Sequence, residues 1–140
     1  MGGEPGFQPL ATERGAEHQV PVLVVDDHRA FREALRALVD ASSGFAVAGM
    51  ACSGEEAVHA AESLAPEVVL MDVVMPGMGG IAAARAILDR CPEMMVVLIS
   101  VDDPALRPDA SALGTTVRCV RKQDLRPAQL RQLWASHNRN

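Results

Sequence analysis

Short apolar runs alternate with helical patterns along most of the 140-residue chain. Each run is rich in valine, leucine, isoleucine or methionine without a polar alternation, which is typical of strands buried on both faces of a parallel sheet. The predicted strands cover residues 20–25, 45–50, 67–71, 95–99 and 117–120.

Apolar residues between these runs recur at the spacing of an α-helix. In the first such segment Phe31, Leu35 and Leu38 would share one face, and Asp27 or His28 would cap the helix. Two prolines shorten the helical pattern before the fifth strand to one or two turns. The predicted helices cover about 28–40, 54–65, 81–90, 108–113 and 127–137.

Strands that alternate with helices form a parallel sheet with helices on both faces. We therefore predict a flavodoxin-like, doubly wound α/β fold with five strands in the order 2-1-3-4-5. One domain would cover residues 20–137. A mobile tail rich in glycine and proline would precede it at 1–19, and 138–140 would form a short C-terminal tail.

Composition and charge exclude some classes of function. The formal charge is −5, and seven of the thirteen basic residues lie in 107–140. This basic end is too sparse and too poor in aromatic residues for nucleic-acid binding, so we interpret it as a solvated helical face. No apolar run approaches the roughly 20 residues that span a bilayer, and the N-terminus has no secretory signal pattern. We expect a cytoplasmic protein without a membrane partner.

The three cysteines, Cys52, Cys91 and Cys119, are far apart in the chain. They are odd in number, and none has a histidine nearby at the spacing of metal ligands. We therefore predict buried thiols in a reducing compartment.

Four of the five predicted strands end in side chains that could carry chemistry. These side chains are Asp26, Asp27, Asp72, Ser100 and Lys122. In the predicted strand order they would converge at the switch point beside the first and third strands. Three neighbouring carboxylates repel one another, and Mg²⁺ with oxygen ligands would relieve that repulsion. The cation and the only lysine would then neutralise an incoming phosphoryl group, and the serine hydroxyl would hydrogen-bond to it.

Each of these residues also has a simpler structural explanation. The paired acids could cap a helix, Asp72 could be a turn residue, and a serine or a lysine alone says little. Their joint placement at strand ends favours a site. Bare carboxylates argue against a flavodoxin-type cofactor site, which needs donors around a phosphate. An aspartyl phosphatase would need a second acid two residues after Asp72, where the chain has Val74.

Two stretches carry a resemblance to a known family. Residues 22–28 read Val-Leu-Val-Val-Asp-Asp-His, and residues 70–80 read Leu-Met-Asp-Val-Val-Met-Pro-Gly-Met-Gly-Gly. With Ser100 and Lys122 they resemble the receiver domain of two-component response regulators, over about 20–137. The sequence of these motifs is most similar to that of the subfamily that usually carries a helix-turn-helix output domain. This resemblance implies the CheY-like form of the fold.

The resemblance also implies a division of roles. Asp26, Asp27 and the Val74 carbonyl would hold Mg²⁺ together with Asp72, which would accept a phosphoryl group from a histidine kinase or a phosphotransfer protein. Lys122 and Ser100 would complete the catalytic set and read the phosphorylated state. The domain would catalyse only its own phosphorylation and dephosphorylation, so it would not be a conventional enzyme.

The resemblance bears on partners as well. It leaves a homodimer open, and DNA would be contacted only through an output domain outside this chain. The chain would be either a stand-alone receiver or a piece of a longer regulator.

The sequence departs from the family pattern near the fourth and fifth strands. Cys119 replaces the usual aromatic residue, Val101 replaces a small residue, and Pro104 and Pro108 interrupt the intervening helix. We therefore expect phosphorylation to cause a smaller or differently located change than usual, centred on 102–115 rather than on position 119. The alternative is a degenerate receiver that acts as a phosphorylation-independent interaction module.

Overall fold

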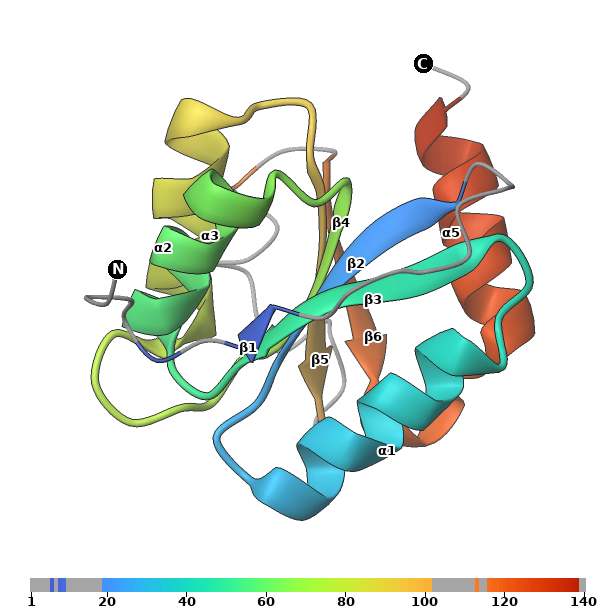
Figure 1. Cartoon of the computed structure of the whole chain (residues 1–140), viewed down its shortest axis with the longest axis horizontal. Coiled ribbons are helices and arrows are strands. Elements are labelled where there is room, and N and C mark those ends of the chain that lie inside the picture. Colours follow the sequence, from blue (N-terminus) through green and yellow to red (C-terminus); the bar gives the residue numbers. More distant parts are fainter. Residues whose placement is uncertain (1–5, 7, 10–18, 102–112, 114–115, 139–140) are drawn as a thin grey trace.

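The computed structural model describes residues 6, 8–9, 19–101, 113 and 116–138. In this part of the chain one sheet runs through the middle, with helices packed on both of its faces (Figure 1). The strands are β1 (Gln8–Pro9), β2 (Val20–Val25), β3 (Phe45–Ala51), β4 (Val68–Asp72), β5 (Met95–Ser100) and β6 (Val117–Arg121). The helices are α1 (Arg29–Asp40), α2 (Gly54–Leu64), α3 (Gly79–Arg90), the 3₁₀-helix η2 (Lys122–Asp124) and α5 (Pro127–Asn138).

The predicted fold is confirmed. Strands β2 to β6 are parallel, and the sheet order β1-β3-β2-β4-β5-β6 contains the predicted order 2-1-3-4-5. The two-residue strand β1, which the sequence pattern did not predict, pairs antiparallel with β3 and covers its edge. The predicted turns at 108–113 and most of the segment 102–115 lie outside the described residues.

The sheet separates two apolar cores because alternate side chains of each buried strand point to opposite faces. Helices α2 and α3 cover one face with small residues, of which Ala57, Ala61 and Ala84 are examples. Helices α1 and α5 cover the other face, and each adds leucine or valine to the core (Figure 1). Scarce aromatics and abundant alanine therefore let α2 and α3 approach the sheet closely.

Local hydrogen bonds define where the helices begin. Helix α2 is capped by the Ser53 hydroxyl, which accepts a hydrogen bond from the Glu56 amide at 3.1 Å. Helix α1 differs from the prediction, because its N-cap residue His28 makes no capping bond with its side chain. Instead the His28 amide donates to Asp26 Oδ1 at 2.9 Å. The carboxylate at the end of β2 thus organises the start of α1.

The prediction of three buried thiols is wrong. Cys52 is exposed, and Cys91 and Cys119 are partly exposed; none of the three forms a disulfide. Each lies where the core ends. Cys52 follows β3, Cys91 is the C-cap residue of α3, and Cys119 belongs to the outermost parallel strand.

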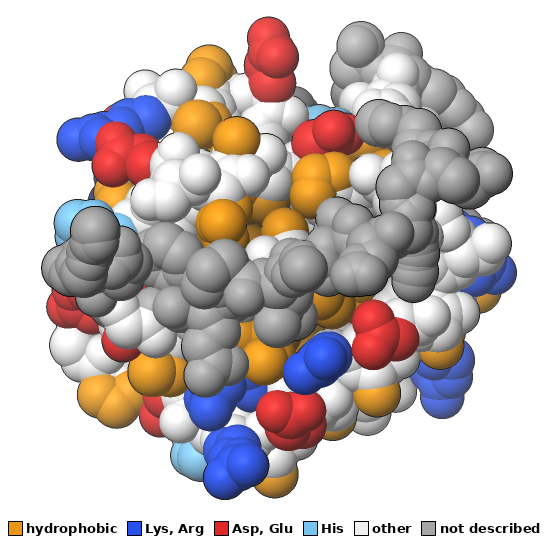
Figure 2. Space-filling model, viewed as in Figure 1, with side chains coloured by type: hydrophobic (Ala, Val, Ile, Leu, Met, Phe, Trp, Pro, Cys, Tyr) orange, Lys and Arg blue, Asp and Glu red, His pale blue; other side chains and the backbone are white. Residues whose placement is uncertain are grey.

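Acidic, basic and apolar side chains are interspersed on the face drawn in Figure 2. On that face the described residues form no continuous basic surface. No helix in the described part of the chain has the length and apolarity needed to cross a membrane.

Candidate functional site

The carboxyl ends of four parallel strands meet at one edge of the sheet, and the predicted site residues lie there. Asp26 directly follows β2, and Asp72 is the last residue of β4. The register pairs Asp72 with Ile99, so that Ser100 lies one residue further along the neighbouring strand. Ser100 in turn pairs with Arg121, which precedes Lys122. The strand ladder therefore brings residues from four separate segments together.

Three of these side chains form a compact cluster with His28. Asp26, Asp27, His28 and Asp72 each offer a ligand atom, and all of these atoms lie within 4.8 Å of one another. Asp26 and Asp72 are buried, whereas the His28 side chain is 70% exposed. Its Nδ1 lies 3.5 Å from Asp26 Oδ1 and 3.3 Å from Asp27 Oδ1. The structure therefore adds a histidine ring that the sequence pattern suggested only as a helix cap.

Lys122 brings the opposite charge to this cluster. Its Nζ atom lies 3.4 Å from Asp72 Oδ2, and only 14% of its side chain is exposed. The same Nζ lies 3.5 Å from the centroid of the Phe31 ring. The sequence pattern had placed Phe31 on the inward face of its helix, with no role in the site. The ammonium group thus sits between a carboxylate of β4 and an aromatic ring of α1.

The loop after β4 is shaped closely around Asp72. The Val74 amide donates to Asp72 Oδ1 at 3.1 Å, and the Val73 amide continues the sheet by donating to the Ile99 carbonyl at 3.0 Å. At the start of α3 the Gly80 amide donates to the Val73 carbonyl at 2.9 Å. A Cβ atom on Gly80 would clash with the Asp72 carbonyl oxygen. The glycine therefore lets α3 begin directly against the end of β4.

The acid cluster has an electrostatic cost. Burial raises the pKa of Asp26, and the charges of Asp72 and Asp27 raise it further. The hydrogen bond from the His28 amide and the charge of Lys122 act in the opposite direction, and the net pKa is above the ordinary value. Asp26 Oδ2 and Asp27 Oδ1 are also buried and accept no hydrogen bond among the described residues, although His28 Nδ1 lies 3.3 Å from Asp27 Oδ1. Grouped carboxylate oxygens that accept no hydrogen bond suit a hard divalent cation.

The raised pKa of Asp26 predicts a pH-dependent stability when no divalent cation is bound. Between the unfolded value of 3.8 and the higher folded value, the native protein binds more protons than the unfolded chain. Stability should therefore fall as the pH rises through that window, and the loss should persist above it. Asp26→Asn keeps an acceptor for the His28 amide and removes the charge. We expect it to melt at a higher temperature than wild type at pH 7 in EDTA.

Thermal unfolding between pH 4 and pH 8 tests this expectation, with Asp89→Asn as the control. Asp89 is an exposed acid near the end of α3 and is not part of the cluster of Asp26, Asp27 and Asp72. Equal melting temperatures of wild type and Asp26→Asn at pH 7, or a gain of the same size in Asp89→Asn, would contradict it.

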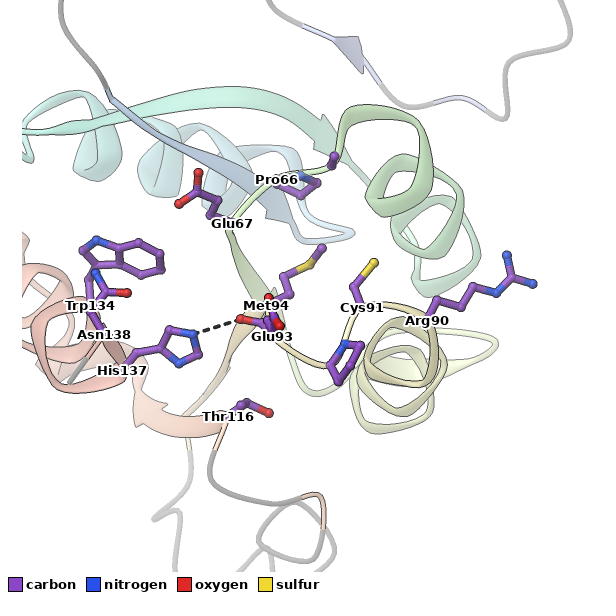
Figure 3. Close-up of a pocket in the computed structure, with 12 residues that line it drawn as sticks. Pro66, Glu67, Arg90, Cys91, Glu93, Met94, Thr116, Trp134, His137 and Asn138 are labelled. Atoms are coloured by element: carbon purple, nitrogen blue, oxygen red, sulfur yellow. Dashed lines mark hydrogen bonds between the residues drawn. The ribbon is translucent and has the colours of Figure 1, made fainter. Parts of the chain in front are cut away.

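A hollow of about 820 Å³ lies at the opposite edge of the sheet (Figure 3). Its wall includes Glu67 and Thr116, each of which precedes a strand, together with Trp134 and His137 of α5. The His137 ring and the Glu93 carbonyl are hydrogen-bonded across the hollow at 3.0 Å, as Figure 3 shows. Because parallel strands separate their amino and carboxyl ends, this hollow is remote from the acid cluster.

The structure thus brings most of the predicted site residues together. Ligand atoms of Asp26, Asp27 and Asp72 lie within 4.8 Å of one another, and Lys122 Nζ lies 3.4 Å from Asp72 Oδ2. Ser100 is buried at the end of the next strand. Val74 has an exposed side chain and contributes its amide to Asp72. Three further residues around the site come from the first turns of α1 and the residue before it: His28, Phe31 and Arg32. In the sequence, only their position within five residues after the acid pair could have indicated that these three residues lie near the site.

The parallel α/β fold and the buried acids at its strand ends define a class of signalling-type α/β domain, and comparison with known proteins gives its family. Residues 22–132 match the family model of the response regulator receiver domain. This match covers most of the chain. The protein belongs to the response regulator receiver domain family.

Curated relatives point to the same family. The chain is 45% identical over 87 residues to the response regulator GacA of Pseudomonas viridiflava, a match that covers 61% of this chain and 41% of GacA. It is 33% identical over 91 residues to the transcriptional regulatory protein DegU of Brevibacillus brevis, covering 65% of this chain and 39% of DegU. The matches therefore span about two fifths of the length of these relatives.

Solved structures agree as well. A LuxR-family two-component response regulator from Aurantimonas sp. SI85-9A1 superposes with a TM-score of 0.75 at 30% identity, covering 86% of each chain. The receiver domain of the NarL response regulator from Mycobacterium tuberculosis gives a TM-score of 0.73 at 31% identity, covering 87% of this chain and 98% of that one. The relatives are mostly of the LuxR/NarL type, as the sequence resemblance predicted.

Proposed function

We propose that this receiver domain is a phosphorylation switch in which Asp72 accepts a phosphoryl group from a histidine kinase or a phosphotransfer protein. The observation that supports this most is the setting of Asp72. Its carboxylate is buried within an acid cluster on one side and lies 3.4 Å from a lysine ammonium on the other. A carboxylate needed only for stability would not gain from two further acids.

The residues of the chain have distinct parts in this reaction. An Asp72 carboxylate oxygen forms a new bond to phosphorus while the bond between phosphorus and the donor nitrogen breaks, and the leaving nitrogen keeps the electron pair. Lys122 neutralises charge on the phosphoryl oxygens, and the Ser100 hydroxyl hydrogen-bonds to one of them. The Val74 amide holds the carboxylate in place through Oδ1. The product is an aspartyl phosphate.

Mg²⁺ is the cofactor that this arrangement would use. Asp26, Asp27, Asp72 and the Val74 carbonyl would hold it. The buried oxygens of the first two acids that accept no hydrogen bond support this choice. When bound, Mg²⁺ neutralises the charge that gathers between the acids and the phosphoryl group.

The relatives suggest how the switch is used. Names such as response regulator and transcriptional regulatory protein support a role in two-component control of transcription. In that setting the receiver would act on DNA only through an output domain. Turnover of a separate substrate is not part of the proposal, because the position two residues after Asp72 carries no acid.

Incubation with acetyl phosphate, with and without Mg²⁺, followed by intact-mass measurement tests the proposal. A single added phosphoryl group that hydroxylamine removes supports an aspartyl phosphate. No adduct under either condition would favour a phosphorylation-independent interaction module. Steady release of phosphate without an adduct would favour a phosphatase.

Asp27→Asn should weaken Mg²⁺ binding. The substitution removes one of the charged ligands while the shape of the side chain stays the same, and we expect a loss of about tenfold, or about 1.4 kcal/mol. Mg²⁺ titration followed by the NMR shifts of the amides of residues 26–28 gives the affinity. Asp89→Asn is the matched control and should bind like wild type. Identical responses of Asp27→Asn and wild type would contradict the cation site.

A further inference from the structure

One aromatic ring at the site has no part in the chemistry proposed above. Phe31 lies in the first turn of α1, and the Lys122 ammonium is 3.5 Å from its ring centroid. We propose that Phe31 is a positioning residue for phosphoryl transfer, which holds Lys122 over the acid cluster by a cation–π interaction. This inference rests on the proposed function and adds a residue to it.

Packing alone does not account for Phe31. Helix α1 buries Leu35 and Val39 in the core beneath it, and Leu38 packs against that core from its rim. Phe31 belongs to neither apolar core of the described residues and does not pack against their rims. Phe31 is only partly buried, and the face of its ring lies against the Lys122 ammonium.

A neutral ring is suited to this task on electrostatic grounds. The site already holds three carboxylates, and a fourth acid used to orient Lys122 would repel an incoming phosphoryl group. An aromatic face attracts an ammonium group through its quadrupole and adds no net charge. Lysine has a long flexible side chain, so without such a support much of its binding energy would be lost in ordering it.

The first turn of α1, which carries Phe31, is hydrogen-bonded to the site. The residue next to Phe31, Arg32, donates from Nη1 to the Asp26 carbonyl at 2.8 Å. The Arg32 amide also donates to the His28 carbonyl at 2.9 Å, which closes the first turn of the helix. The ring is therefore carried by a helix end that is fastened to the acid pair, and it keeps a defined position relative to Asp72.

We expect Phe31→Leu to reduce the rate of phosphorylation by acetyl phosphate about fivefold, and to weaken binding of beryllofluoride with Mg²⁺ by a similar factor. A factor of five corresponds to about 1 kcal/mol, within the range of a partly desolvated cation–π contact. Phe31→Tyr keeps the aromatic face and should retain most of the wild-type rate.

A spectroscopic signature separates positioning from general stability. Protons held over an aromatic face are shifted upfield, so the Lys122 ε-methylene protons should resonate upfield in wild type and in Phe31→Tyr. They should return to ordinary positions in Phe31→Leu. Leu38→Ala is the matched control, because Leu38 lies on the same helix and packs against the core rather than Lys122. It should lower the melting temperature and leave both the methylene shifts and the phosphorylation rate unchanged.

The outcomes distinguish this inference from the proposed function. If wild type forms the aspartyl phosphate and Phe31→Leu forms it at the same rate, the positioning role is wrong and the function stands. Ordinary methylene shifts in wild type would also overturn it. If wild type forms no adduct, the proposed function fails, and the positioning role in phosphoryl transfer fails with it whatever the methylene shifts are. A loss of rate in Leu38→Ala equal to that in Phe31→Leu would assign the effect to stability.

Discussion

Asp72→Asn is expected to abolish phosphorylation. The amide has nearly the shape of the carboxylate and can still accept the hydrogen bond from the Val74 amide at Oδ1. It lacks the negative charge that makes the oxygen a nucleophile, and it removes the ion pair with Lys122. Intact-mass measurement after incubation with acetyl phosphate and Mg²⁺ should therefore show one added phosphoryl group in wild type and none in the variant.

Two controls define the meaning of that result. Ser100→Ala should leave most of the phosphorylation, since the hydroxyl contributes a hydrogen bond rather than the nucleophile. Asp89→Asn should be phosphorylated like wild type, because its exposed side chain lies outside the cluster. Peptide mapping that found the phosphoryl group on a serine or histidine, with Asp72 unmodified, would refute the assignment.

Gly80→Ala should cause a large loss of stability. Helix propensity alone predicts a gain of about 1 kcal/mol from this substitution. The added Cβ would clash with the Asp72 carbonyl oxygen and lie 2.9 Å from the Val73 Cα. Both neighbours are backbone atoms of the strand end and cannot move like a flexible side chain. We expect a net loss of about 3 kcal/mol, at the upper end of what overpacking costs, together with slower phosphorylation because the strand end carries Asp72.

Chemical denaturation measures this loss, and Gly44→Ala provides the comparison. Gly44 has φ of +89° with nothing within 4 Å of an added Cβ, so alanine there brings backbone strain without a clash. Its expected loss is about 1–2 kcal/mol, the cost of a left-handed conformation, with an unchanged phosphorylation rate. A Gly80→Ala protein as stable as wild type would show that α3 can move away from β4 without cost.

Much of the fold could be predicted because the strands that are buried consist of consecutive apolar residues. The run Val68–Asp72 is buried at every position, and such a continuous apolar pattern occurs where helices cover both faces of a sheet. Predicted and observed strand ends agree within one residue for 20–25, 45–50 and 95–99. The same pattern predicted that the acids at the strand ends lie close together, since parallel strands place their carboxyl ends at one edge of the sheet.

Other features escaped prediction because no local pattern encodes them. Strand β1 has two residues, too few for any periodicity, and exists because the edge of β3 offers hydrogen-bond partners. The cysteines were expected inside because thiols are commonly buried, but burial depends on where each strand and helix ends.

The sequence alone determined which groups this protein brings to its site: three carboxylates, one lysine and one serine, each at the end of a predicted strand or beside it. Only the tertiary structure decided how they are held. Phe31 and Lys122 are distant in the chain, yet the ring and the ammonium group lie 3.5 Å apart. A helical pattern can assign Phe31 to one side of α1, but its partner depends on where packing against β2 and β3 places the start of α1 relative to Lys122, which follows β6. That placement results from packing across the whole sheet, which no single segment specifies.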